Sequence, residues 1–288
     1  MKTLLSRPWH CALALLVAAM LLALTPMRSR GAGPGDVPAT DAVRSARAMP
    51  SQPVSKYWEK ARKELYKSTL EIDAQQKTEV ARGLRYRKFM RGDPDRKEIA
   101  ITFDDGPHPA YTPKLLQILK QYDAKATFFI VGEMAEKYPD LVRAELADGH
   151  EIANHTYHHV NLTKIPDSSV PIEIQACGDV LKGITGRRPH LFRPPGGDYD
   201  SQVVNSSESL GYTMVLWTDD PGDYASPGLR VIENRTLGKA TKGGIILIHD
   251  GVQQTVEVLP MLLKTLKDKG FTFVTVDELM RHAPLRSP

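Results

Sequence analysis

The chain has 288 residues, of which 41% are hydrophobic and 25% are charged, the balance of a globular protein long enough for one large domain and an extension. Its net charge of +4 is unevenly distributed: residues 1–33 carry four basic side chains and no acidic one, residues 54–91 carry 11 basic and 5 acidic ones, and residues 92–288 carry 21 basic and 27 acidic ones. The main part is therefore mildly acidic and lacks the basic stripe of a nucleic-acid-binding protein, so we expect no nucleic-acid partner.

The N-terminus has the pattern of an export signal. Lys2 and Arg7 precede an almost uninterrupted apolar run from Trp9 to Leu24. Its core, Cys11–Leu24, is shorter than a membrane span and suits a signal peptide within residues 1–33. We expect export to the periplasm, the cell envelope or the medium, with an uncleaved anchor as the alternative. Cys177 is the only cysteine outside this run, so we expect no intramolecular disulfide.

Two segments separate this signal from the main domain. Residues 34–53 are rich in Gly, Pro, Ala and Ser and are expected to form a flexible linker. In residues 54–91, Trp58, Leu65 and Ile72 recur at intervals of seven, which predicts one basic helical arm with a thin apolar stripe. We interpret the arm as a solvated helix. The alternatives are packing against the main domain, pairing with a partner helix, or association of residues 1–91 with a membrane or wall surface.

From Glu98 onward, within a main domain expected to span residues 92–288, predicted strands and helices alternate. The predicted strands are Glu98–Phe103, Ala126–Val131, His150–Asn154, His190–Phe192, Tyr212–Trp217, Gly244–Ile248 and Thr272–Val276. The predicted helices are Thr112–Gln121, Met134–Asp148, Val170–Thr185, Gln202–Leu210 and Val256–Lys269. This alternation predicts a parallel sheet with helical crossovers, either open or closed into a barrel.

Polar or aromatic side chains follow five of these strands at their carboxyl ends. They are Asp104 and Asp105 after the first strand, His155 and His159 after the third, Arg193 after the fourth, Trp217, Asp220 and Asp223 after the fifth, and His249 after the sixth. In a parallel barrel these ends meet on one face, which carries the chemistry. The pattern therefore favours a barrel with one site on that face.

The histidines and the paired aspartates point to a metal. His155 and His159 are four residues apart, so one turn of helix would place both imidazoles on one side. Two imidazoles and one carboxylate are typical of catalytic zinc, whereas His158 is expected to line the rim. Asp104 and Asp105 would point to opposite sides of a strand. One could bind the metal while the other takes a proton from the water that the metal activates. An ordinary turn or helix cap is the alternative.

The remaining polar residues suit the same chemistry. Arg193 could orient a carboxylate, and the Pro-Pro-Gly-Gly sequence after it could bring backbone N–H groups close to an oxyanion. His249 could be a general acid that Asp223 holds protonated. Trp217 offers a flat apolar surface to a sugar ring or an acetyl methyl group. The alternatives are a surface arginine, a core histidine and a core tryptophan.

Together these residues resemble a known family. The blocks T-F-D-D-G-P, H-T-x-x-H, R-P-P-G-G, W-x-x-D-x-x-D-Y and L-x-H occur in this order over about residues 95–282. They resemble the five motifs of the polysaccharide deacetylases of the NodB-homology type, carbohydrate esterase family 4. The resemblance implies an α/β fold, a deformed (β/α) barrel of about seven parallel strands, which the N-terminal helical arm precedes.

The resemblance also implies a role for each residue of the site. Asp104 is implied as general base, His249 as general acid, Arg193 and Asp223 as the residues that orient or tune them, Asp105, His155 and His159 as metal ligands, and Gly196, Pro195, Trp217 and Leu247 as substrate-binding residues. The implied metal is Zn²⁺, with Co²⁺, Ni²⁺ or Mn²⁺ as alternatives. The family often has tyrosine at the position of Gly196 and tryptophan at that of Tyr224, so the shape of the groove is expected to differ here.

The implied activity is metal-dependent hydrolysis of N-acetyl groups on an extracellular or cell-envelope polysaccharide, with release of acetate. Peptidoglycan, a chitin-like oligomer and an exopolysaccharide all present such a group. We expect this polysaccharide as the partner of a monomeric protein. The alternatives are an O-acetyl esterase acting on an acetylated glycan and a non-catalytic carbohydrate-binding homologue, although the complete set of ligands, base and acid argues against the latter.

Overall fold

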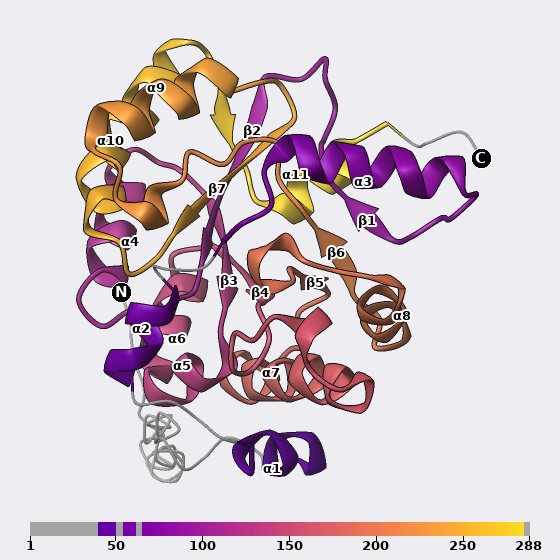
Figure 1. Ribbon diagram of the computed structural model, residues 1–288. Coiled ribbons are helices and arrows are strands. Elements are labelled where there is room, and N and C mark those ends of the chain that lie inside the picture. Colours follow the sequence, from indigo (N-terminus) through magenta and orange to yellow (C-terminus); the bar gives the residue numbers. More distant parts are fainter. Residues whose placement is uncertain (1–39, 50–53, 62–64, 285–288) are drawn as a thin grey trace, which may run out of the picture. The chain divides into compact units, whose positions relative to one another are not determined.

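A parallel sheet forms the centre of the protein (Figure 1). The computed structural model describes residues 40–49, 54–61 and 65–284. The strands are β1 Lys88–Phe89, β2 Glu98–Asp104, β3 Ala126–Ile130, β4 Glu151–Asn154, β5 Leu191–Phe192, β6 Thr213–Val215, β7 Gly244–His249 and β8 Thr272–Phe273. Their order is β1-β6-β5-β4-β3-β2-β7, with β8 paired to the start of β2. All predicted strands are present, with ends shifted by a few residues.

Hydrogen bonds beyond these strands curve the sheet into a deformed barrel. After β6 the chain turns towards β7, and Asp219 forms an isolated parallel bridge with Ile246. The N–H of Leu247 donates to the carbonyl of Asp219 at 2.9 Å. Since β7 also pairs with β2 along its whole length, the ring closes through residues 218–219. The prediction of a deformed (β/α) barrel is confirmed.

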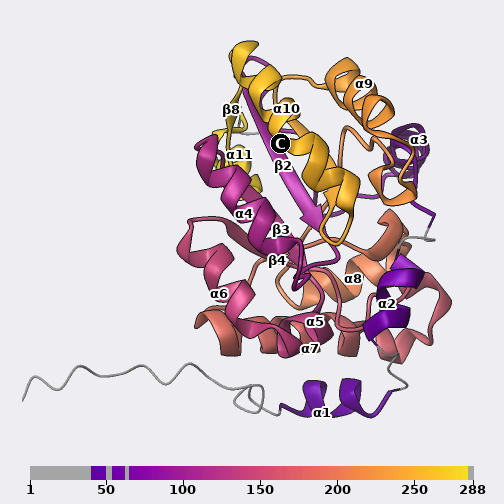
Figure 2. The ribbon, with the colours of Figure 1, turned by 90° about the vertical axis from the view of Figure 1, so that its left-hand side faces the viewer.

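Helices cover the outside of this sheet, and α4 and α10 flank β2 (Figure 2). In the main domain they are α4 Thr112–Gln121, α5 Gly132–Lys137, α6 Pro139–Ala147, α7 Val170–Thr185, α8 Ser201–Ser209, α9 Leu229–Lys239, α10 Gln253–Asp268 and α11 Val276–His282. The predicted helix at 134–148 is two helices, because Pro139 begins a new one. Helices α9 and α11 were not predicted.

Strand β2 divides its side chains between the outer core and the barrel interior. Ile99, Ile101 and Phe103 pack in the cluster under the helices. Thr102 and Asp104 are fully buried but point to the other face, where the Thr102 hydroxyl donates to the carbonyl of Ile246 at 2.9 Å. The period-two alternation of the strand therefore delivers a carboxylate to the interior, at the carboxyl end of the barrel.

The segment before the barrel is more structured than the sequence indicates. Helix α1, Asp41–Arg47, lies inside the predicted flexible linker 34–53. Its Val43 and Ala46 are completely buried, and the Thr40 hydroxyl donates to Asp179 of α7 at 2.7 Å. Since these side chains pack in the core, the prediction of a flexible linker is wrong for residues 41–47.

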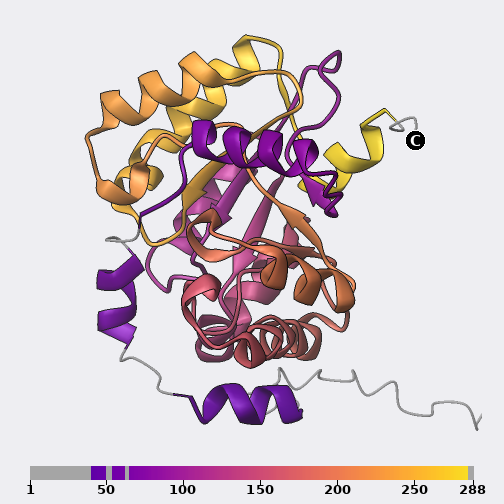
Figure 3. The same cartoon turned by 45° about the vertical axis from the view of Figure 1, so that its right-hand side comes forward.

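Residues 54–91 also differ from the predicted single solvated helix. They form α2 Val54–Ala61, α3 Thr69–Ala81 and β1, which pairs with β6. Ile72 of α3 is fully buried, whereas Leu65 is 90% exposed, so the expected apolar stripe does not exist. Ser68 and Glu71 form a capping box at the N-terminus of α3, so α3 begins as a separate helix. Helix α3 runs across the front of the strands in Figure 3.

Among the described residues, no helix is long and apolar enough to cross a membrane. The predicted signal segment, residues 1–33, lies outside the described residues and stays a prediction. The division of the chain into four regions also stays a prediction, with the qualification that packing and strand pairing cross its boundary at residue 92.

The buried His150 predicts a pH dependence of stability. Burial, together with the charge of Lys125, lowers the pKa of His150 to about 4. Its Nδ1 accepts a hydrogen bond from the N–H of Ala126 at 3.2 Å, which fits a neutral ring. A histidine in an unfolded chain has a pKa of about 6.5, so between these values only the unfolded state takes up this proton. This residue should therefore lower the free energy of unfolding by up to about 3 kcal/mol as pH falls from about 6.5 to 4.

Chemical denaturation between pH 4 and 7 checks this dependence. In His150→Asn the side-chain oxygen can accept the same hydrogen bond without titrating, so the loss of stability at low pH should be smaller than in the wild type. His190→Asn is the control, because the side chain of His190 is 55% exposed. Identical curves for His150→Asn and the wild type would contradict the assignment.

Candidate active site

Two aspartates at the end of β2 face the same histidine. Asp105 adopts a left-handed conformation with φ of 75°, which ends the alternation of the strand. As a result Oδ2 of Asp104 lies 3.6 Å from Nε2 of His155, and Oδ1 of Asp105 lies 3.5 Å from the same nitrogen. The expectation that the two carboxylates point to opposite sides was wrong.

His155 and His159 approach each other through a loop. The chain after β4 is not helical, and Thr156 and His159 have φ of 67° and 55°. Asn154 and Thr156 fix this loop, because the Asn154 side chain accepts from the N–H of Thr156 at 2.9 Å and the Thr156 hydroxyl accepts from that of His159 at 3.1 Å. The ring centroids are 4.9 Å apart. The two imidazoles thus lie together, although the predicted helical turn was wrong.

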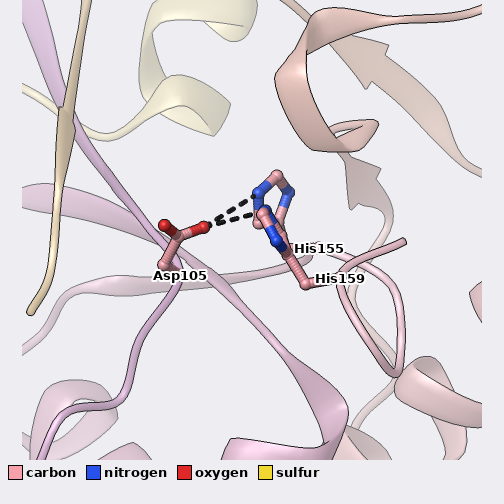
Figure 4. A group of neighbouring side chains, drawn as sticks. All are labelled: Asp105, His155 and His159. Carbon is pink, nitrogen blue, oxygen red and sulfur yellow. Dashed lines mark ion pairs between the residues drawn. The ribbon is translucent and has the colours of Figure 1, made fainter. Parts of the chain in front are cut away.

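Asp105, His155 and His159 converge on one point (Figure 4). Oδ1 of Asp105 is 2.9 Å from Nε2 of His159, and one ligand atom from each of the three residues lies within 4.8 Å of the others. Nδ1 of His155 is 2.8 Å from the carbonyl oxygen of Arg193. A carbonyl only accepts, so Nδ1 carries the proton and the Nε2 lone pair faces Asp105.

The three side chains fit a divalent cation. Oδ1 of Asp105 and Nε2 of His155 are buried and have no hydrogen-bond partner among the described residues. Burial alone would raise the pKa of Asp105, but the charge of His159 is the largest effect in the other direction, and the pKa lies well below its usual range. An ionised carboxylate and two imidazoles form a donor set suited to zinc and similar ions.

Arg193 is a fully buried cation that touches Asp104. Its Nη1 donates to Oδ1 of Asp104 at 2.6 Å and to the Thr102 hydroxyl at 2.8 Å, and its guanidinium lies 4.0 Å from the centroid of the Phe129 ring. Burial lowers the pKa of Arg193, and the charge of Asp104 opposes that shift. Because Oδ1 is engaged by Arg193, Oδ2 is the oxygen directed to His155.

His249 and Asp223 form a second buried pair. Nδ1 of His249 lies 2.7 Å from Oδ1 of Asp223, whose other oxygen accepts from the His249 N–H at 2.8 Å and from the Thr255 hydroxyl. Burial lowers the pKa of His249, but the charge and hydrogen bond of Asp223 outweigh it and raise the pKa to about 10. Nε2 of His249 is therefore a protonated donor at neutral pH.

The four residues predicted to bind the substrate are buried. Gly196 has φ of 64°, and the buried Pro195 precedes it. Trp217 is 1% exposed and Leu247 is fully buried, and both belong to the same core cluster. All eleven predicted site residues are therefore buried at or near the carboxyl end of the barrel.

Two neighbouring polar residues lie apart from this centre. Nδ1 of His158 is 2.7 Å from Glu173, so this ring makes a structural contact on α7. Oδ1 of Asp220 accepts from the N–H of Gly222 at 2.8 Å and stabilises a turn, while burial raises the pKa of Asp220.

Two tyrosines at the site were missed by the sequence analysis. The Tyr57 hydroxyl donates to the carbonyl of Asp105 at 3.0 Å, and the Tyr66 ring centroid lies 4.7 Å from that of His249. Both come from the segment that was interpreted as a solvated arm. Its aromatic residues Tyr57, Trp58 and Tyr66, among many charged ones, were the signal that could have indicated contact with the barrel.

The family model for polysaccharide deacetylases matches residues 91–215. The chain is 42% identical over 198 residues to a peptidoglycan-N-acetylglucosamine deacetylase of Bacillus cereus, covering 65% of this chain and 90% of the relative. The chain belongs to the polysaccharide deacetylases of the NodB-homology type, carbohydrate esterase family 4. This deacetylase is also 36% identical over 192 residues to a chitooligosaccharide deacetylase of Azorhizobium caulinodans, covering 62% of this chain and 91% of the relative.

A solved structure of the family has the same fold. The crystal structure of a peptidoglycan N-acetylglucosamine deacetylase in complex with 4-naphthalen-1-yl-N-oxidanyl-benzamide superimposes with a TM-score of 0.67 at 34% identity. The match covers 73% of this deacetylase and 98% of that chain. The expectation of an enzyme of the polysaccharide N-deacetylase class is thereby confirmed, and its family is metal-dependent.

Gly197 lies directly against the indole of Trp217, so a methyl group added at position 197 should displace that ring. Gly197 has φ of +68°, and a Cβ there would lie 2.5 Å from Cη2 of Trp217. Gly186 has φ of +80° and nothing within 4 Å of such a Cβ. Alanine at either position costs about 1–2 kcal/mol for the left-handed conformation. Only Gly197→Ala also displaces the indole, so it should lower the free energy of unfolding by about 1–3 kcal/mol more than Gly186→Ala.

Chemical denaturation of the two variants measures this difference, and tryptophan emission reports displacement of the indole. Gly186→Ala should leave the emission spectrum unchanged. Equal losses of stability in both variants would argue against the close contact at Gly197.

Proposed function

We propose that this deacetylase hydrolyses N-acetyl groups of an envelope polysaccharide, with N-acetylglucosamine of peptidoglycan as the first candidate. The observation that carries the proposal is the pairing of Asp104 with His249. These residues are direct partners in neighbouring strands β2 and β7, so a carboxylate and a protonated imidazole lie side by side next to the cation-binding residues. Amide hydrolysis needs such a pair, because water must lose a proton and the leaving amine must gain one.

Asp105, His155 and His159 would hold the divalent cation, with Zn²⁺ as the first candidate. When bound, such a cation supplies Lewis-acid chemistry, polarising the acetyl carbonyl and lowering the pKa of the attacking water. The buried carboxylate and the orientation of the His155 ring by the Arg193 carbonyl support this assignment.

The chain's own groups would move the protons. Asp104, oriented by Arg193, accepts a proton as the water oxygen attacks the carbonyl carbon. The Gly196 N–H donates to the oxyanion that forms. Nε2 of His249 donates to the amide nitrogen as the carbon–nitrogen bond breaks, which leaves acetate and a free amino sugar. Trp217, Leu247 and Pro195 would enclose the acetyl group.

The preference for peptidoglycan is supported by the B. cereus relative and by the crystal structure, both of peptidoglycan deacetylases. The apolar run at residues 9–24 supports export to the envelope. The test is acetate release from peptidoglycan, from chitin oligosaccharides and from an O-acetylated xylan, with and without chelator, together with fractionation of the producing cells. Release from xylan alone would contradict the proposed N-deacetylation.

Asp104→Asn tests the proposed role of Asp104 as the base independently of cation binding. The variant keeps Asp105, His155 and His159, so it should retain the metal but lose about 10²–10⁴-fold in acetate release. His155→Ala removes a ligand and should lower the metal content itself. Elemental analysis of both purified variants, beside their rates of acetate release, checks the assignment. Near-complete activity of Asp104→Asn would remove Asp104 from the mechanism.

Asp223→Asn should change the pH profile. A general acid must be protonated, and Asp223 raises the pKa of His249 to about 10, so the wild type should hold this proton through neutral pH. Without the charge and hydrogen bond of Asp223, the effect of burial is opposed by the charges of Asp105 and Asp104, so the pKa of His249 should fall from about 10 towards its ordinary value of about 6.5. Acetate release at pH 7.5 should then drop about 10²–10³-fold and recover in part as the pH is lowered.

The exposed Asp268 provides the control for this substitution, since Asp268→Asn makes the same chemical change on the surface of α10. Its pH profile should match that of the wild type. If Asp223→Asn lost activity equally at every pH, Asp223 would serve to position His249 without controlling its protonation.

A further inference from the structure

The reacting groups of the proposed mechanism are closed off from solvent. Asp104, Arg193 and His249 are fully buried, and Trp217 is 1% exposed. The cation-binding side chains are closed off as well, since Asp105 is the most exposed of them at 3%. A polysaccharide cannot reach atoms without accessible surface, so the residues that cover them decide when the enzyme can act.

Tyr66 covers the acid side of the site. Its ring centroid lies 4.7 Å from that of His249 at an interplanar angle of 68°, 4.5 Å from Tyr224 and 6.4 Å from Trp217. Tyr66 is 9% exposed, and its hydroxyl oxygen is buried. The ring therefore stands against both the proposed proton donor and the proposed acetyl pocket.

Lys67, which follows Tyr66 in the chain, is hydrogen-bonded to the loop that contains Gly196. The N–H of Lys67 donates to the Gly196 carbonyl at 3.0 Å. Its Nζ pairs with Asp198 at 3.0 Å and donates to Gln75 at 2.7 Å, and the side chains of Lys67 and Asp198 are 25% and 29% exposed. These attachments lie outside any sheet, so they can separate while the barrel stays intact.

Tyr57 covers the cation side. Its hydroxyl donates to the backbone carbonyl of Asp105, and its ring stands edge-on to His159 with centroids 6.0 Å apart. Tyr57 is 4% exposed. Tyr57, Tyr66 and Lys67 together are called the tyrosine cover. Its residues come from before the barrel, and they meet both halves of the site.

We propose that the tyrosine cover is an autoinhibitory contact that must move away before a glycan can bind. This inference rests on the proposed function of the site. Glycan binding is weakened by the fraction of molecules in the closed state, so weakening the cover should raise kcat/KM. A tyrosine that formed only one wall of an open groove would leave His249 accessible beside it, and His249 has no exposed surface.

The test uses the full chain loaded with Zn²⁺ and chitin oligosaccharides as the substrate. Tyr66→Ala removes the ring, and Lys67→Glu makes the contact with Asp198 repulsive while keeping the backbone N–H. Both should raise kcat/KM for acetate release by about tenfold. Lys77→Glu makes the same charge change at an exposed position of α3 and should leave kcat/KM unchanged. Unchanged or reduced kcat/KM in folded Lys67→Glu would overturn the proposal.

A second readout does not depend on turnover. The cover also shields the cation-binding residues, so Tyr66→Ala and Lys67→Glu should transfer Zn²⁺ to a chelator several-fold faster than the wild type and Lys77→Glu. If no variant releases acetate but transfer is faster, the proposed function fails and the cover stands. If the wild type releases acetate and neither readout changes, the cover fails and the proposed function stands. Lys67→Glu decides alone if Tyr66→Ala does not fold.

Discussion

The burial of Asp104 and Asp105 at adjacent positions is the constraint around which the site is arranged. Two neighbouring carboxylates with almost no exposed surface repel each other and lose their hydration, so each needs a partner of positive charge or a strong donor. Asp104 obtains this from Arg193 and Asp105 from His159. The left-handed turn at Asp105 makes the arrangement possible, because it brings both carboxylates to one side of the sheet.

Arg193 contributes to the site through both its side chain and its backbone. Its side chain holds Asp104, while its carbonyl oxygen fixes the proton of His155 on Nδ1. Through His249, a further proton donor stands beside the acidic pair, and its own partner Asp223 compensates the charge that this proton brings. The site thus contains buried pairs of opposite charge. Removing one charged side chain of a pair leaves its partner buried without a counter-charge.

Much of this could be predicted from the sequence, because the information is local. Apolar runs of four to six residues specified β2, β3 and β7, and polar residues directly after the strands specified the face of the site. The conformations of Asp105 and His159 could not be predicted, since left-handed φ values in residues other than glycine are imposed by surrounding contacts. The helices α1 and α3 were misjudged for a related reason. Their short apolar faces, such as Val43 with Ala46 or Ile72, gain their stability from tertiary packing.

The pairing of β1 with β6 has a consequence for how the protein can be divided. Phe89 packs against the cluster that contains Trp217, and Ile72 belongs to the same cluster. Tyr66 belongs to this cluster too, so the smallest unit that keeps it complete begins at or before residue 66, well upstream of residue 91, where the match to the family model begins. In this protein the residues matched by the family model and the segment before them share one hydrophobic core, so a chain cut at residue 91 would lose buried apolar contacts of its own barrel.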